Sequence, residues 1–144
     1  MTLAPSSADI EATPAPDPSD LISFDTLLTA EEIALRDRVR TYVRDEIKPN
    51  IAQWYEEARF PLEIVPDLAK LGLLGMHLKG YGCAGGTAVD YGLAAAELEA
   101  GDSGLRTFVS VQGSLAMPAI SKHGTEERKQ EWLHRLEAGT ATGG

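Results

Sequence analysis

Hydrophobic residues recur at the spacing of an α-helix along most of the chain after residue 22. Thr29 and Glu32 have the spacing of a capping box, which starts a helix. The apolar positions that follow keep a helical period: Leu35, Val39, Tyr42, Val43, Ile47, Ile51, Trp54 and Ala58. We expect one helical run here, kinked or briefly broken at Pro49, because proline cannot donate a backbone hydrogen bond.

Two further helices and a loop are expected in the middle of the chain. Pro61 suits the first turn of a second helix, which should end near Gly72. Residues 72–86 hold six glycines and should form an irregular loop. A third helix over residues 87–100 is nearly all Ala, Leu, Val and Tyr on its inner sides, so we expect it to be deeply buried.

The last third of the chain predicts two more helices. Asp102 can cap a fourth helix, with an inward stripe made of Leu105, Phe108, Val109, Gln112, Leu115, Ala116 and Ile120. A fifth begins near Thr125 and stops before Gly139. Since the alternation typical of strands is almost absent, the predicted fold class is all-α, with about five to six helices packed in a bundle-like array. Residues 1–22, rich in Ala, Pro, Ser and Asp, are expected to be a disordered tail.

Composition and charge narrow the class of protein. The net charge is −9 and the sequence pI about 4.7. This argues against binding to nucleic acid and against docking on an anionic membrane surface. No run is long and apolar enough to span a bilayer. Cys83 is the single cysteine, so no internal disulfide is possible. Without a basic, apolar or arginine-rich leader at the start, we expect a cytoplasmic protein.

Most motifs in the sequence have a structural interpretation. Residues 80–85 match G-x-G-x-x-G, but that fingerprint binds a dinucleotide only between a strand and a helix, so we interpret it as a glycine turn. His77, His123 and His134 have no metal-ligand spacing among themselves or with Cys83. Cys83 has no basic neighbour in sequence and is interpreted as a buried small residue.

Arg106 is the candidate binding residue. It falls in the first turn of the helix that Asp102 caps, where a cation meets the positive end of the helix dipole. Together Arg106, Thr107 and Ser110 can form a niche for a carboxylate, with the guanidinium as a bidentate clamp. The alternative is an arginine paired with Asp102 or a surface glutamate, and periodicity alone favours that alternative.

The order of the motifs resembles that of acyl-CoA dehydrogenases over about residues 24–139. The segments that carry the resemblance are residues 71–75 (LGLLG), 79–85 (KGYGCAG), 97–99 (ELE), 102–106 (DSGLR), 110–117 (SVQGSLAM) and 124–130 (GTEERKQ). Within the family, residues 79–85 and 102–106 are similar to the glutaryl-CoA branch. The resemblance implies that residues 23–139 form the family's N-terminal helical domain and that residues 140–144 begin a β-domain that is missing here.

The resemblance also implies a function. The family's enzymes bind FAD, mainly through the later domains, and a carboxylate outside this chain removes the α-proton of an acyl-CoA while a hydride passes to the flavin. In the glutaryl branch, loss of CO2 usually follows, giving crotonyl-CoA. Arg106 then matches the arginine that reaches the distal carboxylate of the substrate. The resemblance therefore favours the carboxylate niche over the pairing of Arg106 with Asp102 or a surface glutamate. Thr107 stands where the branch usually has serine, and Ser110 is a second polar contact.

The end of the chain departs from the family's pattern. After the last helix relatives continue into a Gly-Cys-Phe-Gly-Leu-Thr-Glu-Pro-like strand, whereas this chain ends Ala138-Gly139-Thr140-Ala141-Thr142-Gly143-Gly144. We therefore expect these 144 residues to lack the catalytic base and to be inactive alone. The full-length enzyme would use an electron-transfer flavoprotein or a similar acceptor and form a homotetramer. Two alternatives stay open, namely a dehydrogenase for another short-chain acyl-CoA and a non-enzymatic helical interaction module.

Overall fold

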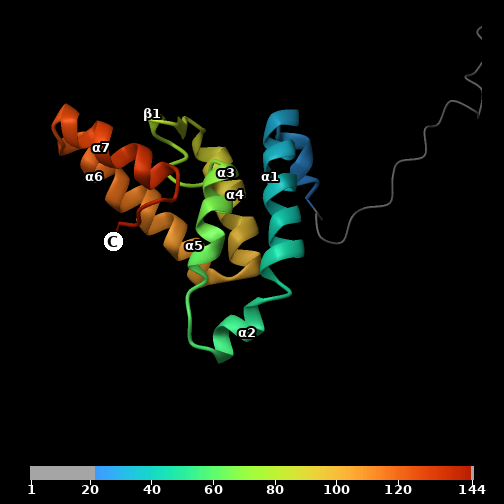
Figure 1. The fold of residues 1–144 in the computed structure, drawn as a ribbon. Helices are drawn as coiled ribbons and strands as arrows, with labels where there is room; N and C mark the ends of the chain where they lie inside the picture. Colours follow the sequence, from blue (N-terminus) through green and yellow to red (C-terminus); the bar gives the residue numbers. More distant parts are fainter. Residues whose placement is uncertain (1–21, 144) are drawn as a thin grey trace, which may run out of the picture.

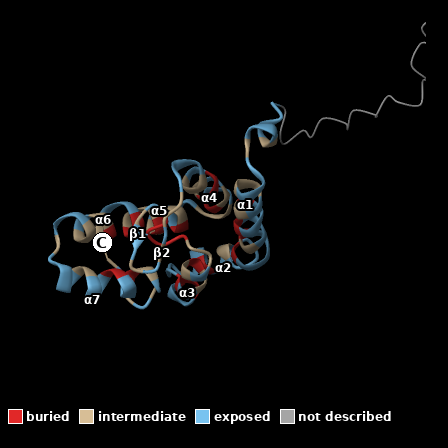
Figure 2. Ribbon diagram, turned by 90° about the horizontal axis from the view of Figure 1, so that it is seen from above, coloured by how far each residue is buried: buried red, intermediate tan, exposed pale blue. Residues whose placement is uncertain are grey.

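The computed structural model describes residues 22–143, and this part of the chain is all-α, as predicted (Figure 1). Apart from Ile22, the tail expected over residues 1–22 lies outside the described residues. The helices α1, α3, α4 and α5 pack around the larger hydrophobic core, and α6 and α7 enclose a smaller one at the C-terminal end. Figure 2 shows the buried positions on the sides of the helices that face each other.

The first helical run is divided where the proline was expected to break it. The capping box forms as predicted: Thr29 N donates to Glu32 Oε2 (2.8 Å) and Glu32 N donates to Thr29 Oγ1 (3.2 Å). The helix α1 spans Ala30–Tyr42 and continues as a π-helical segment over Val43–Ile47. A turn over residues 48–50, which includes Pro49, then leads into α2, Ile51–Glu56, so the predicted break is confirmed.

Ion pairs attach α1 to the short helix before it and to α4. Arg36 is buried and forms ion pairs with Asp37 and with Asp25 of the short 3-10 helix η1, Phe24–Leu27. These two carboxylates hold the pKa of Arg36 above its ordinary value, despite the opposing effect of burial. Toward α4, Arg40 binds Glu97 through both Nε (3.1 Å) and Nη2 (2.8 Å). The arginines of α1 therefore stabilise its packing as well as covering its outer face.

The second predicted helix starts later than expected. Pro61 precedes a 3-10 turn, η3 (Leu62–Ile64), and α3 covers only Val65–Lys70. The end near Gly72 is confirmed, with this glycine in the left-handed region at φ 74°.

The glycine-rich loop is more ordered than predicted. Within residues 72–86, β1 (Lys79–Gly80) pairs antiparallel with β2 (Cys83–Ala84). The two turn positions between them, Tyr81 and Gly82, both have positive φ, as in the tight turns that join hairpin strands. The expectation of a wholly irregular loop was wrong in this respect.

The third predicted helix is α4, Ala88–Gly101, but it is less buried than expected. Thr87 and Asp90 form its capping box, with hydrogen bonds of 2.8 and 3.1 Å. Its buried residues are Leu93, Ala94 and Leu98, whereas Val89 is 46% exposed and the small residues Gly92, Ala96 and Ala100 are also exposed. Because α1 and α5 cover only part of its circumference, the prediction of deep burial on all inner sides was wrong.

The fourth predicted helix is a continuous rod of three parts. The helix α5 (Ser103–Ser110) passes into a π-helical segment, η4 (Val111–Ala116), and then into α6 (Met117–His123). The wider turns of the π segment change which residues face inward. Gln112 and Gly113 are buried, followed by Met117, while Leu115 is 68% exposed. Placing Leu115 on the inward stripe was therefore wrong, because the prediction assumed an unbroken α-helical period.

The last helix packs back against this rod. The helix α7, Glu126–Glu137, begins after Thr125 and ends before Gly139, as predicted, and the Thr125 side chain caps it. Leu133 and Leu136 pack against Met117. The side chain of Gln112 is fully buried and holds the segment after α7. Its Nε2 donates to the carbonyl oxygens of Leu136 (3.1 Å) and Ala141 (3.2 Å), and its Oε1 accepts from Gly143 N (2.7 Å). None of the helices within residues 22–143 has the length and hydropathy needed to cross a membrane.

Candidate functional site

A narrow cleft between α4 and α5 contains the predicted binding arginine. Asp102 is the only residue between the two helices, and its side chain accepts a hydrogen bond from Leu105 N (2.8 Å), which caps α5 as predicted. The cleft is lined mostly by apolar side chains, with Arg106 and Tyr91 as its polar members: Leu73, Met76, Tyr91, Ala94, Ala95, Leu98, Arg106 and Val109.

Arg106 is partly exposed and has one ion-pair partner. Its Nε donates to Glu99 Oε2 at 2.6 Å, and this bond holds the pKa of the guanidinium above its ordinary value. Of the partners that the sequence left open, a surface glutamate is therefore present, while Asp102 is used as the helix cap. Among residues 22–143, no acceptor binds the two terminal nitrogens of Arg106. These are the nitrogens that bind a carboxylate in the bidentate arrangement.

The other two predicted residues lie on the same helix but outside the lining of the cleft. Thr107 is exposed, and its hydroxyl group donates to Ser103 O (2.8 Å), one turn back along α5. Ser110 is half-buried, and its hydroxyl group has no hydrogen bond within the described part of the chain. The structure thus places Arg106 in the cleft, leaves Ser110 with an unused hydroxyl, and commits the proton of Thr107 to the backbone.

Two further polar residues adjoin the cleft that sequence reasoning did not identify. Ser114, one turn beyond Ser110, donates to the hydroxyl group of Tyr91 at 3.3 Å. The ring of Tyr91 packs edge-on against His77, with ring centroids 6.2 Å apart. A signal for Ser114 exists in the sequence, because Arg106, Ser110 and Ser114 recur at intervals of four. Nothing in the local sequence identifies Tyr91, whose partner comes from another helix.

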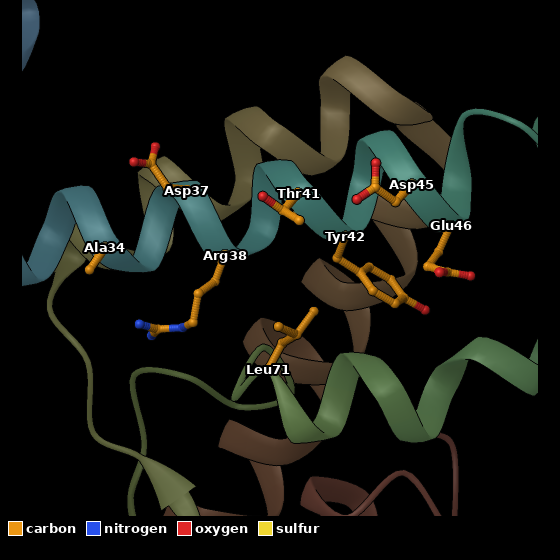
Figure 3. A pocket seen from close by; sticks show the side chains of 8 residues that line it. All are labelled: Ala34, Asp37, Arg38, Thr41, Tyr42, Asp45, Glu46 and Leu71. Carbon is orange, nitrogen blue, oxygen red and sulfur yellow. The ribbon is translucent and has the colours of Figure 1, made fainter.

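A separate groove on the outer side of α1 contains none of the predicted site residues. Figure 3 shows Arg38 and Tyr42 extending from α1 toward Leu71, whereas Asp37 and Asp45 point away from it. Burial, followed by nearby carboxylates, raises the pKa of Tyr42 to about 12. The groove is open and most of its lining side chains are solvated, so it has the character of a surface feature of α1.

The glycine turn and the histidines do not form a site. Residues 80–84 of this motif belong to the β1–β2 hairpin, whose strands pair antiparallel, so the α4 helix that follows is not the helix of a βαβ unit. A Cβ atom at Gly82 would meet Glu137 Oε2 at 2.6 Å, so a carboxylate lies against this turn. Cys83 is half-buried rather than buried, and burial followed by the charge of Glu137 raises the pKa of its thiol. No cluster of metal-ligating side chains occurs among residues 22–143.

Comparison with known proteins relates this arrangement to one family. Residues 29–140 match the model of the acyl-CoA dehydrogenase N-terminal domain. A short-chain-specific acyl-CoA dehydrogenase from Clostridium acetobutylicum is 37% identical over 83% of this chain and 32% of its own length.

Two solved structures are more similar in sequence. One is a glutaryl-CoA dehydrogenase from Mycobacterium smegmatis in complex with FADH2, with 54% identity and a TM-score of 0.82 over 85% of this chain and 32% of that one. The other is also a glutaryl-CoA dehydrogenase from M. smegmatis, with 56% identity and a TM-score of 0.82 over 86% and 32%. The chain therefore spans about a third of the length of the relatives it matches.

Proposed function

Because the chain belongs to the acyl-CoA dehydrogenase family, we propose that it is the N-terminal helical domain of an FAD-dependent dehydrogenase that oxidises glutaryl-CoA. In this proposal residues 23–139 are the helical domain and residues 140–144 lead into the next one. Oxidation would be followed by loss of CO2, giving crotonyl-CoA.

The free end of Arg106 is the observation that carries the proposed substrate. Glu99 occupies Nε and leaves both terminal nitrogens available at the cleft. A glutaryl group differs from a butyryl group by a distal carboxylate, and a paired guanidinium suits that group. The identity of more than half of the aligned residues to the two glutaryl-CoA dehydrogenase structures from M. smegmatis supports the same substrate.

The three predicted site residues keep distinct roles in this proposal. Arg106 supplies the positive charge and two donors to the distal carboxylate, and Glu99 orients the guanidinium. Ser110 contributes a hydroxyl group that the rest of the described chain does not use. Thr107 takes part as an acceptor, or donates after releasing Ser103 O.

The flavin is assigned to parts of the protein beyond this chain. The described residues do not fit a dinucleotide, because the N-terminus of α4, which follows the glycine turn, is occupied by the capping box of Thr87 and Asp90, and Glu137 lies against the turn itself. A carboxylate there would repel a pyrophosphate group. The catalytic base is likewise assigned to a later domain, so residues 1–144 alone should not turn over substrate. We further propose a cytoplasmic homotetramer that passes electrons to an electron-transfer flavoprotein or a similar acceptor.

The test is the variant Arg106→Gln in the full-length protein, assayed with FAD, an electron acceptor and two substrates. Loss of a hydrogen bond to a charged group costs about 1.5–3 kcal/mol, so kcat/KM for glutaryl-CoA should fall by roughly 10- to 150-fold. The effect on butyryl-CoA should be small, because that substrate has no distal carboxylate. Arg44→Gln is the matched control, since Arg44 is exposed on the π-helical segment after α1 and binds only its neighbour Asp45.

The same assay separates the main proposal from its rival. A relative of this chain is specific for short-chain acyl-CoA, and a butyryl-type enzyme would use butyryl-CoA well and respond equally to Arg106→Gln with both substrates. Equal effects would remove the proposed role of Arg106. Turnover of glutaryl-CoA by residues 1–144 alone would contradict the assignment of the base and flavin to later domains.

A further inference from the structure

Two hydrogen bonds tie α4 to the helical rod that carries Arg106. Glu99 of α4 accepts from Arg106 of the rod, and two helical turns further from Asp102 the hydroxyl groups of Tyr91 and Ser114 form the second bond. Both pairs are centred between Asp102 and Ser103, as expected for two antiparallel helices joined there. The same numbering pairs Ser110 of the rod with Ala95 of α4, whose side chain is only a methyl group. A polar row on the rod therefore faces a small apolar residue at its middle and a polar residue of α4 at each end.

The hydroxyl group of Tyr91 can donate to a ligand. A phenol donates one hydrogen bond and can accept others. Its oxygen lies 3.3 Å from Ser114 Oγ, and because either hydroxyl group can donate in this pair, Tyr91 keeps its proton for a ligand whenever Ser114 donates. Ser114 is the one hydrogen-bond partner of the Tyr91 hydroxyl among residues 22–143. The edge-on ring of His77 also packs against the tyrosine, with ring centroids 6.2 Å apart.

Tyr91 and Arg106 line the same cleft. The remaining lining side chains have no polar side-chain group that could compete for a ligand. The free interior of the cleft is only about 10 Å³, so an anionic group would bind at its opening. There it would meet two kinds of donor, the terminal nitrogens of Arg106 and the phenol of Tyr91.

We propose that Tyr91, held by Ser114, is a specificity-determining residue for the dicarboxylic acyl group, donating a hydrogen bond to the terminus that Arg106 binds by charge. This inference rests on the proposed function. A site built to hydrogen-bond a substrate group discriminates strongly against substrates that lack the group, because its donors are then left unpaired. Arg106 thus attracts the distal carboxylate, and Tyr91 disfavours acyl chains that lack one.

The experiment compares Tyr91→Phe, Ser114→Ala and Arg106→Gln in the full-length flavoprotein with glutaryl-CoA and butyryl-CoA. Tyr91→Phe removes only the hydroxyl group, and Tyr55→Phe is its matched control, because Tyr55 is 87% exposed on α2. We expect Tyr91→Phe to lower the ratio of kcat/KM for glutaryl-CoA over butyryl-CoA roughly tenfold. Ser114→Ala should shift the ratio in the same direction by less, and Tyr55→Phe should leave it unchanged.

The outcomes separate this inference from the proposed function. If the wild type prefers glutaryl-CoA and Arg106→Gln removes the preference while Tyr91→Phe keeps it, the role of Tyr91 is refuted and the proposed function stands. An equal loss with both substrates, together with a lower melting temperature, would make the Tyr91–Ser114 contact one of helix packing and overturn the inference. If the wild type has no preference for glutaryl-CoA, the proposed function fails first.

Discussion

The fully buried side chain of Gln112 gives the sharpest test of how the helical domain is held together. Its amide makes three hydrogen bonds, two donated to the carbonyl oxygens of Leu136 and Ala141 and one accepted from Gly143 N. The substitution Gln112→Glu keeps the shape and the acceptor but removes both donors. A protonated carboxyl group can restore one of the donated bonds, whereas a carboxylate would face two carbonyl oxygens in a site with no exposed surface.

The magnitude follows from these contacts and depends on pH. With the introduced carboxyl protonated, the loss is one neutral hydrogen bond, about 1 kcal/mol. Burial raises the pKa of such a group above its unfolded value near 4.3, and each unit of the shift adds about 1.4 kcal/mol once the pH exceeds the folded pKa. For a shift of about two units, the variant should be about 4 kcal/mol less stable than the wild type at neutral pH. Stability should return as the pH falls toward the unfolded pKa, because the folded state holds its proton more tightly.

Thermal unfolding of residues 1–144, followed by circular dichroism at pH 5 and pH 7.5, measures this effect. For a domain of this size 1 kcal/mol corresponds to roughly 4 °C, so the melting temperature should fall by about 15 °C at pH 7.5 and by about 8 °C at pH 5. Gln130→Glu is the matched control, since Gln130 is exposed on α7 and binds only the side chain of Glu126. Equal stability of Gln112→Glu and the wild type at pH 7.5, or the same loss at both pH values, would refute the role assigned to Gln112.

Three further predictions concern other parts of the fold. Folding raises the pKa of Tyr42 from 10.0 to about 12, so the folded state loses stability as the pH rises between these values. In Tyr42→Phe the unfolding free energy, measured by urea titration, should therefore fall less between pH 9.5 and 11.5 than in the wild type. The thiol of Cys83, whose pKa burial and Glu137 raise, should react with iodoacetamide more slowly than a free cysteine at pH 8, and Glu137→Gln should speed the reaction; unchanged rates would contradict this. A Cβ atom at Gly113 would lie 3.0 Å from Gly75 N, so Gly113→Ala should destabilise the domain by about 1–3 kcal/mol in urea unfolding, despite the higher helix propensity of alanine.

Three helix starts could be predicted from sequence because they depend on local chemistry. Thr29 and Asp102 were identified as caps, and a helix was expected to begin near Thr125. Each of the three side chains accepts a backbone hydrogen bond in the structure. The break at Pro49 follows from the same kind of local rule, the missing N–H group of proline. Features decided within four residues are therefore well predicted in this chain.

Features decided by packing between segments could not be predicted. The π-helical segment before Pro118 turns Leu115 outward, and a hydrophobic period of 3.6 residues cannot reveal that change. The extent of burial of α4 depends on which of its neighbours are present, and its small outward residues look the same in sequence as buried ones. The β1–β2 hairpin is only two residue pairs long, too short for an alternating pattern.

In the candidate site, too, local features could be predicted and contacts between helices could not. Arg106 was identified because a cation at the start of a helix breaks a local rule, and the motif that contains it carried the resemblance to a family. Its partner Glu99 was anticipated only as an unspecified surface glutamate. Tyr91 and Ser114 meet only after α4 and the rod have packed together, so their contact has no local signal.

An anaerobic titration of the native full-length protein with glutaryl-CoA, followed by the flavin absorbance, tests the proposed function most directly. A protein that carries this chain as its N-terminal third should contain bound FAD, and glutaryl-CoA should bleach the flavin at much lower concentration than butyryl-CoA does. A native protein without flavin, or a flavin that butyryl-CoA bleaches and glutaryl-CoA does not, would contradict the proposed function.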